Sequence, residues 1–285
     1  MQLLIDGDLV AYRCAASVGE DGLEETAIWR CNNLIQELLH TTGAETYQCF
    51  LTGYDNFRKE VNKEYKANRK DTVPPKWLQQ CRKFLIETWN AEISSGCEAD
   101  DLLGMAQNKQ DFNDEVTMIA SLDKDLLMIP GYHYNWVREE REFVLPIDGL
   151  RHLYKQMLIG DRSDNIFGVV GLGKVKAAKI IDPLEDEEEM ISTVFDLYKG
   201  DAERFLMNAQ CLWILQNEGE TWANRSIDLT LPDPLRQELE AKLDFMKYLM
   251  QGISTEPITN PVKTSGIPVN GIVPDSMEIS QHQLT

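Results

Sequence analysis

Four groups of acidic residues have types and spacings suited to binding metal ions. Their members are Asp6 and Asp8; Glu98, Asp100 and Asp101; Asp123 and Asp125; and Asp161 and Asp164. Acids two apart at a strand end point the same way, and acids three apart on a helix share a face, as we expect for Asp161 and Asp164 if that segment is helical. Carboxylates are the ligands that Mg²⁺ and Mn²⁺ prefer, and such a cluster repels itself without cations. The pattern therefore predicts a divalent-metal site.

Two such ions roughly 4 Å apart can activate a water and stabilise a leaving oxygen, as hydrolysis of a phosphodiester requires. Other interpretations stay open at this point. For each acidic pair taken alone, a helix cap or a solvated turn is the favoured interpretation. Asp6-Gly7-Asp8 also suits the nucleophile loop of a haloacid-dehalogenase-type phosphatase, in which Asp6 would be a covalent nucleophile.

A basic segment follows the second expected strand, with nine basic and three acidic residues between Arg58 and Lys83. Within it, Lys66 and Arg69 are three residues apart, so one helical turn would present both to one phosphate, with Lys70 beside them. We expect Lys66 and Arg69 to orient a phosphate and offset its developing charge. The alternative is an ordinary solvated loop.

A glycine-rich turn at 168–173 leads into an expected amphipathic helix. Gly171 and Gly173 allow close approach of a phosphate, and the free amides of a helix start favour anions. Lys174, Lys176 and Lys179 add positive charge, which favours a grip on the DNA backbone over a plain helix–helix connection.

The apolar pattern predicts how these groups are positioned. Strands are expected at 3–5, 47–52, 116–122, 132–137 and 142–145, and helices at 24–40, 76–90 and 98–109. This alternation over 1–145 predicts an α/β fold with a mostly parallel sheet and loops gathered at the carboxyl ends of its strands. The segment 53–74 reads as a long loop or mobile arch, 146–252 as a helical region, and 253–285 as a disordered or loosely packed tail.

Composition limits the class of protein. The net charge of −19 opposes nucleic-acid binding when taken alone, but it averages over the basic segments. No apolar run is long enough to span a membrane, and the first residues do not resemble a signal peptide. The six cysteines form no C-x-x-C pair, so we expect reduced thiols in a cytoplasmic protein, in the host cytoplasm if phage-encoded.

Together these motifs resemble the 5′-nuclease superfamily, which includes flap endonucleases, the 5′-nuclease domain of bacterial DNA polymerase I and phage 5′–3′ exonucleases, with short-tailed-phage exonucleases the most similar in appearance. The stretches that carry the resemblance occur in the family's order at 4–8, 65–69, 98–101, 123–126 and 160–173. The resemblance implies a PIN-like catalytic core over 1–145 with a helical arch. It also implies a helix–three-turn–helix DNA-binding motif within 146–252.

The resemblance also implies residue roles. Metal-cluster positions fall on Asp6, Glu98, Asp100, Asp101, Asp123, Asp125, Asp161 and Asp164. The phosphate-steering pair falls on Lys66 and Arg69. The segment from Gly171 to Lys179 falls on the motif that holds duplex DNA, commonly with a potassium ion on backbone carbonyls. Two positions depart from the pattern: the family's second aspartate has only Asp55 nearby, slightly displaced, and a usual lysine is replaced by Val175 between Lys174 and Lys176.

These implications predict a monomeric nuclease with two Mg²⁺ or Mn²⁺ ions that leaves 5′-phosphates. Expected substrates are 5′ ends of duplex DNA, 5′ flaps and RNA primers on DNA. Besides the phosphatase, the alternatives are a DNA-binding module without catalysis and a PIN-type ribonuclease. The balance of exonuclease against flap cutting, processivity and the role of 190–285 are not determined by the sequence.

Overall fold

The computed structural model describes residues 1–109, 116–253 and 260–261. Over these residues the main sheet has seven strands in the order β3-β2-β1-β4-β5-β6, with β9 paired to β2. Their bounds are β1 Gln2–Asp6, β2 Thr46–Leu51, β3 Glu92–Ile93, β4 Thr117–Ala120, β5 Gly131–Asn135, β6 Glu140–Val144 and β9 Asn260–Pro261. Strands β1 to β5 are parallel, whereas β6 and β9 pair antiparallel to their neighbours. The predicted mostly parallel α/β sheet is confirmed.

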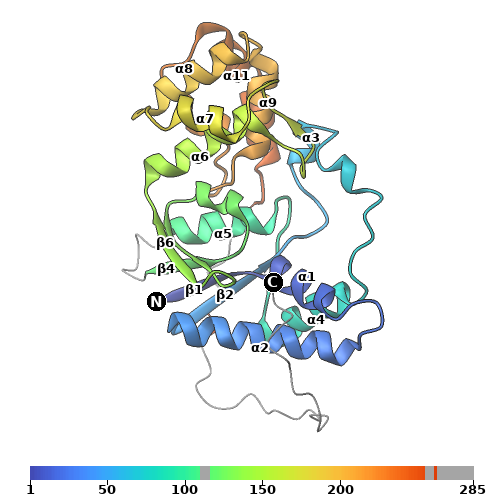
Figure 1. Cartoon of the computed structure of the whole chain (residues 1–285). Coiled ribbons are helices and arrows are strands. Elements are labelled where there is room, and N and C mark those ends of the chain that lie inside the picture. The colour runs from blue at the N-terminus through green and yellow to red at the C-terminus, as the bar shows by residue number, and fades with distance from the viewer. Residues whose placement is uncertain (110–115, 254–259, 262–285) are drawn as a thin grey trace.

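Both faces of the sheet are covered, and nearly every residue of its central strands β1, β2 and β4 is buried. In β1, Leu3 and Ile5 belong to the core shared with α1, α2 and α4, whereas Leu4 points to the opposite core, shared with α5 and the helical region. This alternation follows from the two-residue period of a strand. Figure 1 shows the resulting layers, with α2 and α4 below the sheet and α5 above it.

The helices account for most of the remaining chain. Their bounds are α1 Gly7–Ser17, α2 Glu24–Thr42, α3 Arg58–Val61, α4 Leu78–Trp89, α5 Ala99–Asn108, α6 Pro146–Ile159, α7 Lys174–Ile181, α8 Glu187–Leu197, α9 Ala202–Leu212, α10 Trp222–Arg225 and α11 Asp233–Leu249. Helices α6 to α9 and α11 gather at one end of the molecule (Figure 1). One continuous apolar core joins them to α5 and to one face of the sheet, so the division at residue 145 stays a prediction.

The segment 53–74 contains more regular structure than a loop. It includes α3 and a single 3₁₀ turn, η1 (Ala67–Arg69), and then runs to Pro74-Pro75 and α4. In Figure 1 the stretch between α3 and α4 passes from the helical region to the layer of α1 and α4. Lys66 precedes η1 with a left-handed backbone (φ 56°), which turns the chain at this point.

One local prediction is wrong. Asp161 and Asp164 do not share a helix face, because α6 ends at Ile159. Asp161 closes the two-residue strand β7 (Gly160–Asp161), which pairs with β8 (Ile166–Phe167) across a tight turn that contains Asp164. Asn165 in this turn has φ 60°, a backbone that asparagine tolerates better than most residues and a helix does not contain.

Two predictions concern the far end of the chain. The predicted tail at 253–285 lies outside the described residues, apart from Ile253 and β9. Among the helices of the described ranges, none is sufficiently long and apolar to cross a membrane.

Candidate active site

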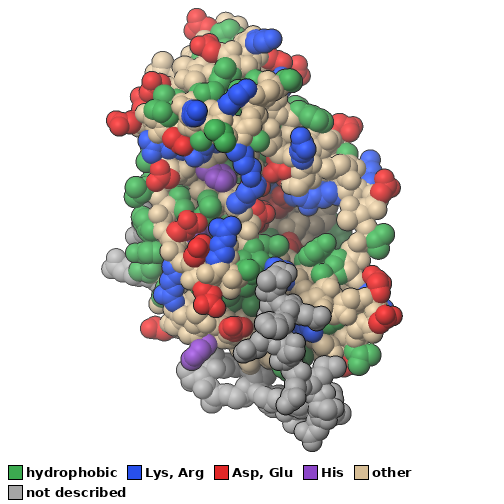
Figure 2. All heavy atoms as spheres, viewed as in Figure 1, with side chains coloured by type: hydrophobic (Ala, Val, Ile, Leu, Met, Phe, Trp, Pro, Cys, Tyr) green, Lys and Arg blue, Asp and Glu red, His purple; other side chains and the backbone are tan. Residues whose placement is uncertain are grey.

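A cleft of about 820 Å³ lies where the carboxyl ends of β1, β2 and β4 meet the segment 53–74. The acidic residues that line it are Asp6, Asp8, Glu60, Glu98, Asp100, Asp123, Asp125 and Asp164. Its basic lining includes Lys66, Arg69 and Lys70. Figure 2 shows acidic side chains inside this hollow and Lys and Arg side chains around it. The arrangement brings predicted metal ligands and predicted phosphate-binding residues together.

Asp6 sits at the junction of β1 and α1, where a helix start follows the strand directly. Its Oδ1 accepts a hydrogen bond from the Leu9 amide (3.1 Å), and its Oδ2 accepts one from Ser121 Oγ (2.7 Å). The side chain is only 3% exposed, and burial raises its pKa to about 7, with smaller contributions from the charges of Asp8 and Asp123. A buried carboxylate that lies near other carboxylates is stabilised by a bound cation.

Asp123 and Asp125 follow β4 and begin the 3₁₀ helix η3 (Lys124–Met128). Asp123 caps this helix by accepting the Asp125 amide (2.9 Å). Burial and then the charge of Asp125 raise the pKa of Asp123. Although burial raises the pKa of Asp125, the nearby His152 and the hydrogen-bonded Lys124 outweigh it and lower this pKa. The pair therefore places two carboxylates beside Asp6 across the ends of adjacent strands.

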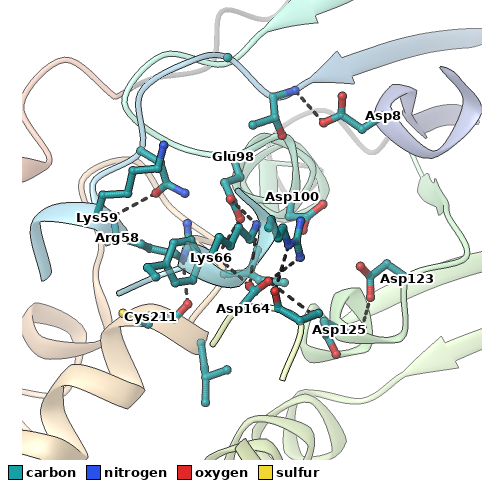
Figure 3. A pocket seen from close by; sticks show the side chains of 18 of the residues that line it. Asp8, Arg58, Lys59, Lys66, Glu98, Asp100, Asp123, Asp125, Asp164 and Cys211 are labelled. Atoms are coloured by element: carbon teal, nitrogen blue, oxygen red, sulfur yellow. Dashed lines mark hydrogen bonds and ion pairs between the residues drawn. The ribbon is translucent and has the colours of Figure 1, made fainter. Parts of the chain in front are cut away.

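Lys66 lies between the carboxylates at the other side of the cleft (Figure 3). Its ammonium donates to Glu98 and lies 3.8 Å from Asp164 Oδ2, and Arg69 donates to Asp164 Oδ1 at 2.7 Å. Although burial raises the pKa of Glu98, Lys66 and Arg58 bring it below its ordinary value. The two basic residues that were predicted to hold a phosphate therefore neutralise cleft carboxylates here.

Asp100 and Asp164 are two further cleft carboxyl groups whose pKa values are raised. Burial, followed by the charges of Asp6, Asp123 and Glu98, raises the pKa of Asp100 well above its usual value. Burial also raises the pKa of Asp164, despite Lys66. Among the described residues no three acidic, His or Cys side chains form a finished metal-ligand set. Since Lys66, Arg69 and Lys124 occupy several of these carboxylates, a metal would bind by displacing such cations or protons.

Three predicted ligands lie apart from the cleft lining. Asp55 is exposed, and the lining passes through its neighbours Tyr54 and Asn56 instead. Asp101 is fully buried in a bidentate ion pair with Arg58, which leaves no carboxylate oxygen facing the cleft. Neither residue lines the cleft, so metal binding by Asp55 and Asp101 stays a prediction.

Asp161 lies just beneath the lining. It is 8% exposed and accepts hydrogen bonds from the Ser163 amide (2.7 Å) and hydroxyl (2.6 Å), and it lies close enough to influence Asp125. These bonds hold the turn that presents Asp164.

The lysines of the glycine turn lie away from the cleft. Lys174, Lys176 and Lys179 are exposed on α7, whose N-cap is Gly173. Gly171 has φ 83°, a left-handed backbone that glycine adopts without strain, so its place in the turn is explained by conformation. Val175, at the position that departs from the family pattern, is 70% exposed.

Sequence reasoning missed several residues that orient the site. The Tyr65 hydroxyl lies 3.1 Å from Glu98 Oε2 and 2.8 Å from Asp164 Oδ2, although Tyr65 is 4% exposed. Arg82 on α4 pairs with Asp8, whose other oxygen accepts the Thr52 amide (2.8 Å). His152 on α6 lies 3.9 Å from Asp125. The signal for Tyr65 was its place directly before Lys66; Arg82 and His152 meet their partners only through the fold.

Comparison with known sequences identifies a family. Residues 1–152 match the model of the 5′–3′ exonuclease N-terminal resolvase-like domain. DNA polymerase I of Bacillus caldotenax is 27% identical over 225 residues, which cover 70% of this chain and 25% of that protein. A 5′–3′ exonuclease of Buchnera aphidicola is 29% identical over 190 residues, which cover 60% of this chain and 66% of that protein. The chain thus spans about a quarter of the polymerase and two thirds of the exonuclease.

Comparison with solved structures supports the same fold. The bacteriophage T5 protein crystallised with metal ions superposes with a TM-score of 0.60 and 16% identity, over 86% of this chain and 99% of that one. The T5 flap endonuclease in a complex with DNA and metal ions superposes with a TM-score of 0.56 and 16% identity, over 86% of this chain and 99% of that one.

The raised pKa of Asp6 has a measurable consequence for stability without metal. Because the folded-state pKa of about 7 exceeds the usual value of 3.8, the folded protein binds a proton that the unfolded chain has lost, and stability falls as pH rises through this window. We expect Asp6→Asn to raise the melting temperature in EDTA at pH 8, by on the order of 5 °C, and to leave it nearly unchanged at pH 4.

Circular dichroism melts at the two pH values measure this difference. The exposed Asp228→Asn is the matched control and should shift neither melt. An equal effect of Asp6→Asn at both pH values would contradict the raised pKa.

Proposed function

The chain belongs to the 5′–3′ exonuclease family, and from this we propose that it is a divalent-metal-dependent nuclease that hydrolyses DNA from 5′ ends and at 5′ flaps. The observation that supports the proposal best is the shared cleft, in which carboxylates from the ends of β1 and β4, the start of α5 and the turn after β7 lie with Lys66 and Arg69. RNA primers on DNA are included among the proposed substrates. A monomer in the cytoplasm is likewise proposed.

The carboxylates of the cleft fit two Mg²⁺ or Mn²⁺ ions. Their oxygens are hard ligands, and four of these carboxyl groups, Asp6, Asp100, Asp123 and Asp164, have raised pKa values that a cation would lower. We assign Asp6, Asp100, Asp123 and Asp125 as direct holders, with Glu98, Asp161 and Asp164 around them. When bound, two ions supply an activated water and stabilise the leaving 3′-oxygen, so that the product keeps a 5′-phosphate.

In this proposal, Lys66 and Arg69 are the side chains that bind the scissile phosphate. They lie one turn apart at η1, and Arg69 is half exposed while Lys66 reaches inward. With bound metal ions offsetting the negative charge of the cleft, Lys66 and Arg69 would be free to leave Glu98 and Asp164, bind the scissile phosphate and offset its charge. Lys70, exposed at the cleft edge, is placed to bind a neighbouring phosphate.

The turn before α7 is the proposed grip on duplex DNA. Gly171, Gly173 and the amides that begin α7 face outward, with Lys174, Lys176 and Lys179 beside them. A potassium ion fits this turn less well, because the Gly171 carbonyl already accepts a hydrogen bond from Lys176 Nζ at 3.0 Å. In our proposal this ammonium takes the place of a potassium ion.

The alternative functions are less consistent with the site. A phosphatase nucleophile must be accessible, but Asp6 is 3% exposed and uses both oxygens as acceptors. Asp8, the second aspartate of that loop, is paired with Arg82. A DNA-binding module without catalysis would gain nothing from burying mutually repelling carboxylates in a cleft with Lys66.

A cleavage assay tests the proposed activity. With 5′-labelled duplex and 5′-flap DNA, we expect short labelled products in Mg²⁺ or Mn²⁺ and none in EDTA. Asp123→Asn/Asp125→Asn should lower the rate by more than about 10³-fold, because it removes two carboxylates that would hold the metal ions. The exposed Asp228→Asn should cut at the wild-type rate.

Product lengths separate exonuclease from flap cutting. Binding without cleavage in either metal would favour the non-catalytic module, and hydrolysis of a small phosphate ester that Asp6→Asn abolishes would favour the phosphatase.

If the Lys176 ammonium takes the place of a potassium ion, DNA binding should not depend on potassium. DNA affinity of the wild type, measured by fluorescence anisotropy, should be equal in KCl and NaCl of the same ionic strength. Lys176→Met should bind more tightly in KCl than in NaCl, because its Gly171 carbonyl becomes free for an ion. A wild type that itself prefers KCl would contradict this assignment, and Lys247→Met on α11 is the matched lysine control.

A further inference from the structure

The most completely bonded ion pair in the described structure lies just behind the cleft. Arg58, the first residue of α3, is 2% exposed, and Asp101 in the first turn of α5 is 0% exposed. The Arg58 Nη1 donates to Asp101 Oδ2 at 2.6 Å, and Nη2 donates to Oδ1 at 2.7 Å. This bidentate geometry fixes the relative orientation of the two side chains.

Arg58 also binds the end of a third element. Its Nε donates to the carbonyl of Cys211 at 2.9 Å, and Nη2 donates to the carbonyl of Trp213 at 2.6 Å. These carbonyls lie at the C-terminal end of α9, where the helix dipole favours a cation. One guanidinium therefore joins the base of the segment 53–74, the start of α5 and the end of α9.

Asp101 completes the junction with its remaining acceptor positions. Oδ2 accepts the Glu98 amide at 2.9 Å, and Oδ1 accepts the Leu215 amide at 3.0 Å. Each oxygen thus accepts two hydrogen bonds, which fills the usual lone-pair directions of a carboxylate. Glu98 and Asp100, which precede Asp101 in the same turn, line the cleft instead.

We propose that Arg58 and Asp101 are positioning residues, and that Asp101 is not a metal ligand in this protein. The pair fixes the first turn of α5, and with it Glu98 and Asp100, relative to the segment that carries Lys66 and Arg69. Burial of two charges is costly, and apolar residues of similar volume often stabilise a fold as well. What the pair supplies is a fixed geometry, on which the reaction depends because small displacements of reacting groups slow it strongly.

This inference rests on the proposed nuclease activity for its rate prediction, but its metal prediction is independent of cleavage. Mn²⁺ binding is counted by electron paramagnetic resonance for the wild type, Asp101→Asn and Asp125→Asn. We expect Asp101→Asn to bind as many ions as the wild type and Asp125→Asn to bind fewer. Loss of an ion in Asp101→Asn would overturn the proposal. If Asp101→Asn alone does not fold, Arg58→Gln/Asp101→Asn provides the same count without an unpaired buried charge.

The positioning role is tested with Arg58→Lys, which keeps the charge but cannot reach Asp101 and both α9 carbonyls at once. We expect wild-type DNA affinity and Mn²⁺ count, and a single-turnover cleavage rate lower by about 10²-fold. A folded Arg58→Lys that cuts at the wild-type rate would overturn the role. If the wild type cuts no substrate, the proposed function fails, while the Mn²⁺ counts still decide whether Asp101 is a ligand.

Discussion

Mutual repulsion among buried carboxylates is the constraint on which the rest of this structure depends. Burial raises the pKa values of Asp6, Asp100 and Asp123, and neighbouring carboxylates add to this effect: Asp123 at Asp6, Asp6 and Asp123 at Asp100, and Asp125 at Asp123. In the structure described here, Lys66, Arg69 and Lys124 offset part of this charge. The negative charge of the cleft can therefore be offset either by these side chains or by metal ions bound with a substrate. If metal ions offset it, Lys66 can leave its carboxylate partner and bind a phosphate.

The fold brings these charges together by simple geometry. Strands β1 and β4 are parallel neighbours, so Asp6 and the residues after Ala120 meet at one edge of the sheet. The start of α5 and the turn after β7 add Asp100 and Asp164 from the opposite core layer. Because the sheet is apolar on both faces, its edge is where charged groups can remain partly hydrated. The Arg58–Asp101 pair then ties the segment 53–74 to this edge from behind.

Much of this arrangement was accessible from the sequence. Apolar runs that end in Asp6 and in Asp123 predicted buried strands with acids at their ends, and the order of motifs predicted the fold. The helical placement of Asp161 and Asp164 failed because Gly160 ends α6 and permits a β-turn that side-chain spacing cannot reveal. The ion pair of Asp101 could not be predicted from the sequence for a different reason. Its partners Arg58 and Leu215 are 43 and 114 residues distant along the chain, and no local pattern connects them.

In the proposed mechanism, the Lys66 ammonium exchanges the Glu98 carboxylate for a DNA phosphate. The most direct test is a crystal structure with Mn²⁺ and a 5′-phosphorylated DNA product. An anomalous difference map would locate the manganese ions. We predict manganese peaks among Asp6, Asp100, Asp123 and Asp125, with the Lys66 ammonium moved from Glu98 to the DNA phosphate. A structure in which Lys66 remains paired with Glu98 and the cleft contains no manganese would contradict the account.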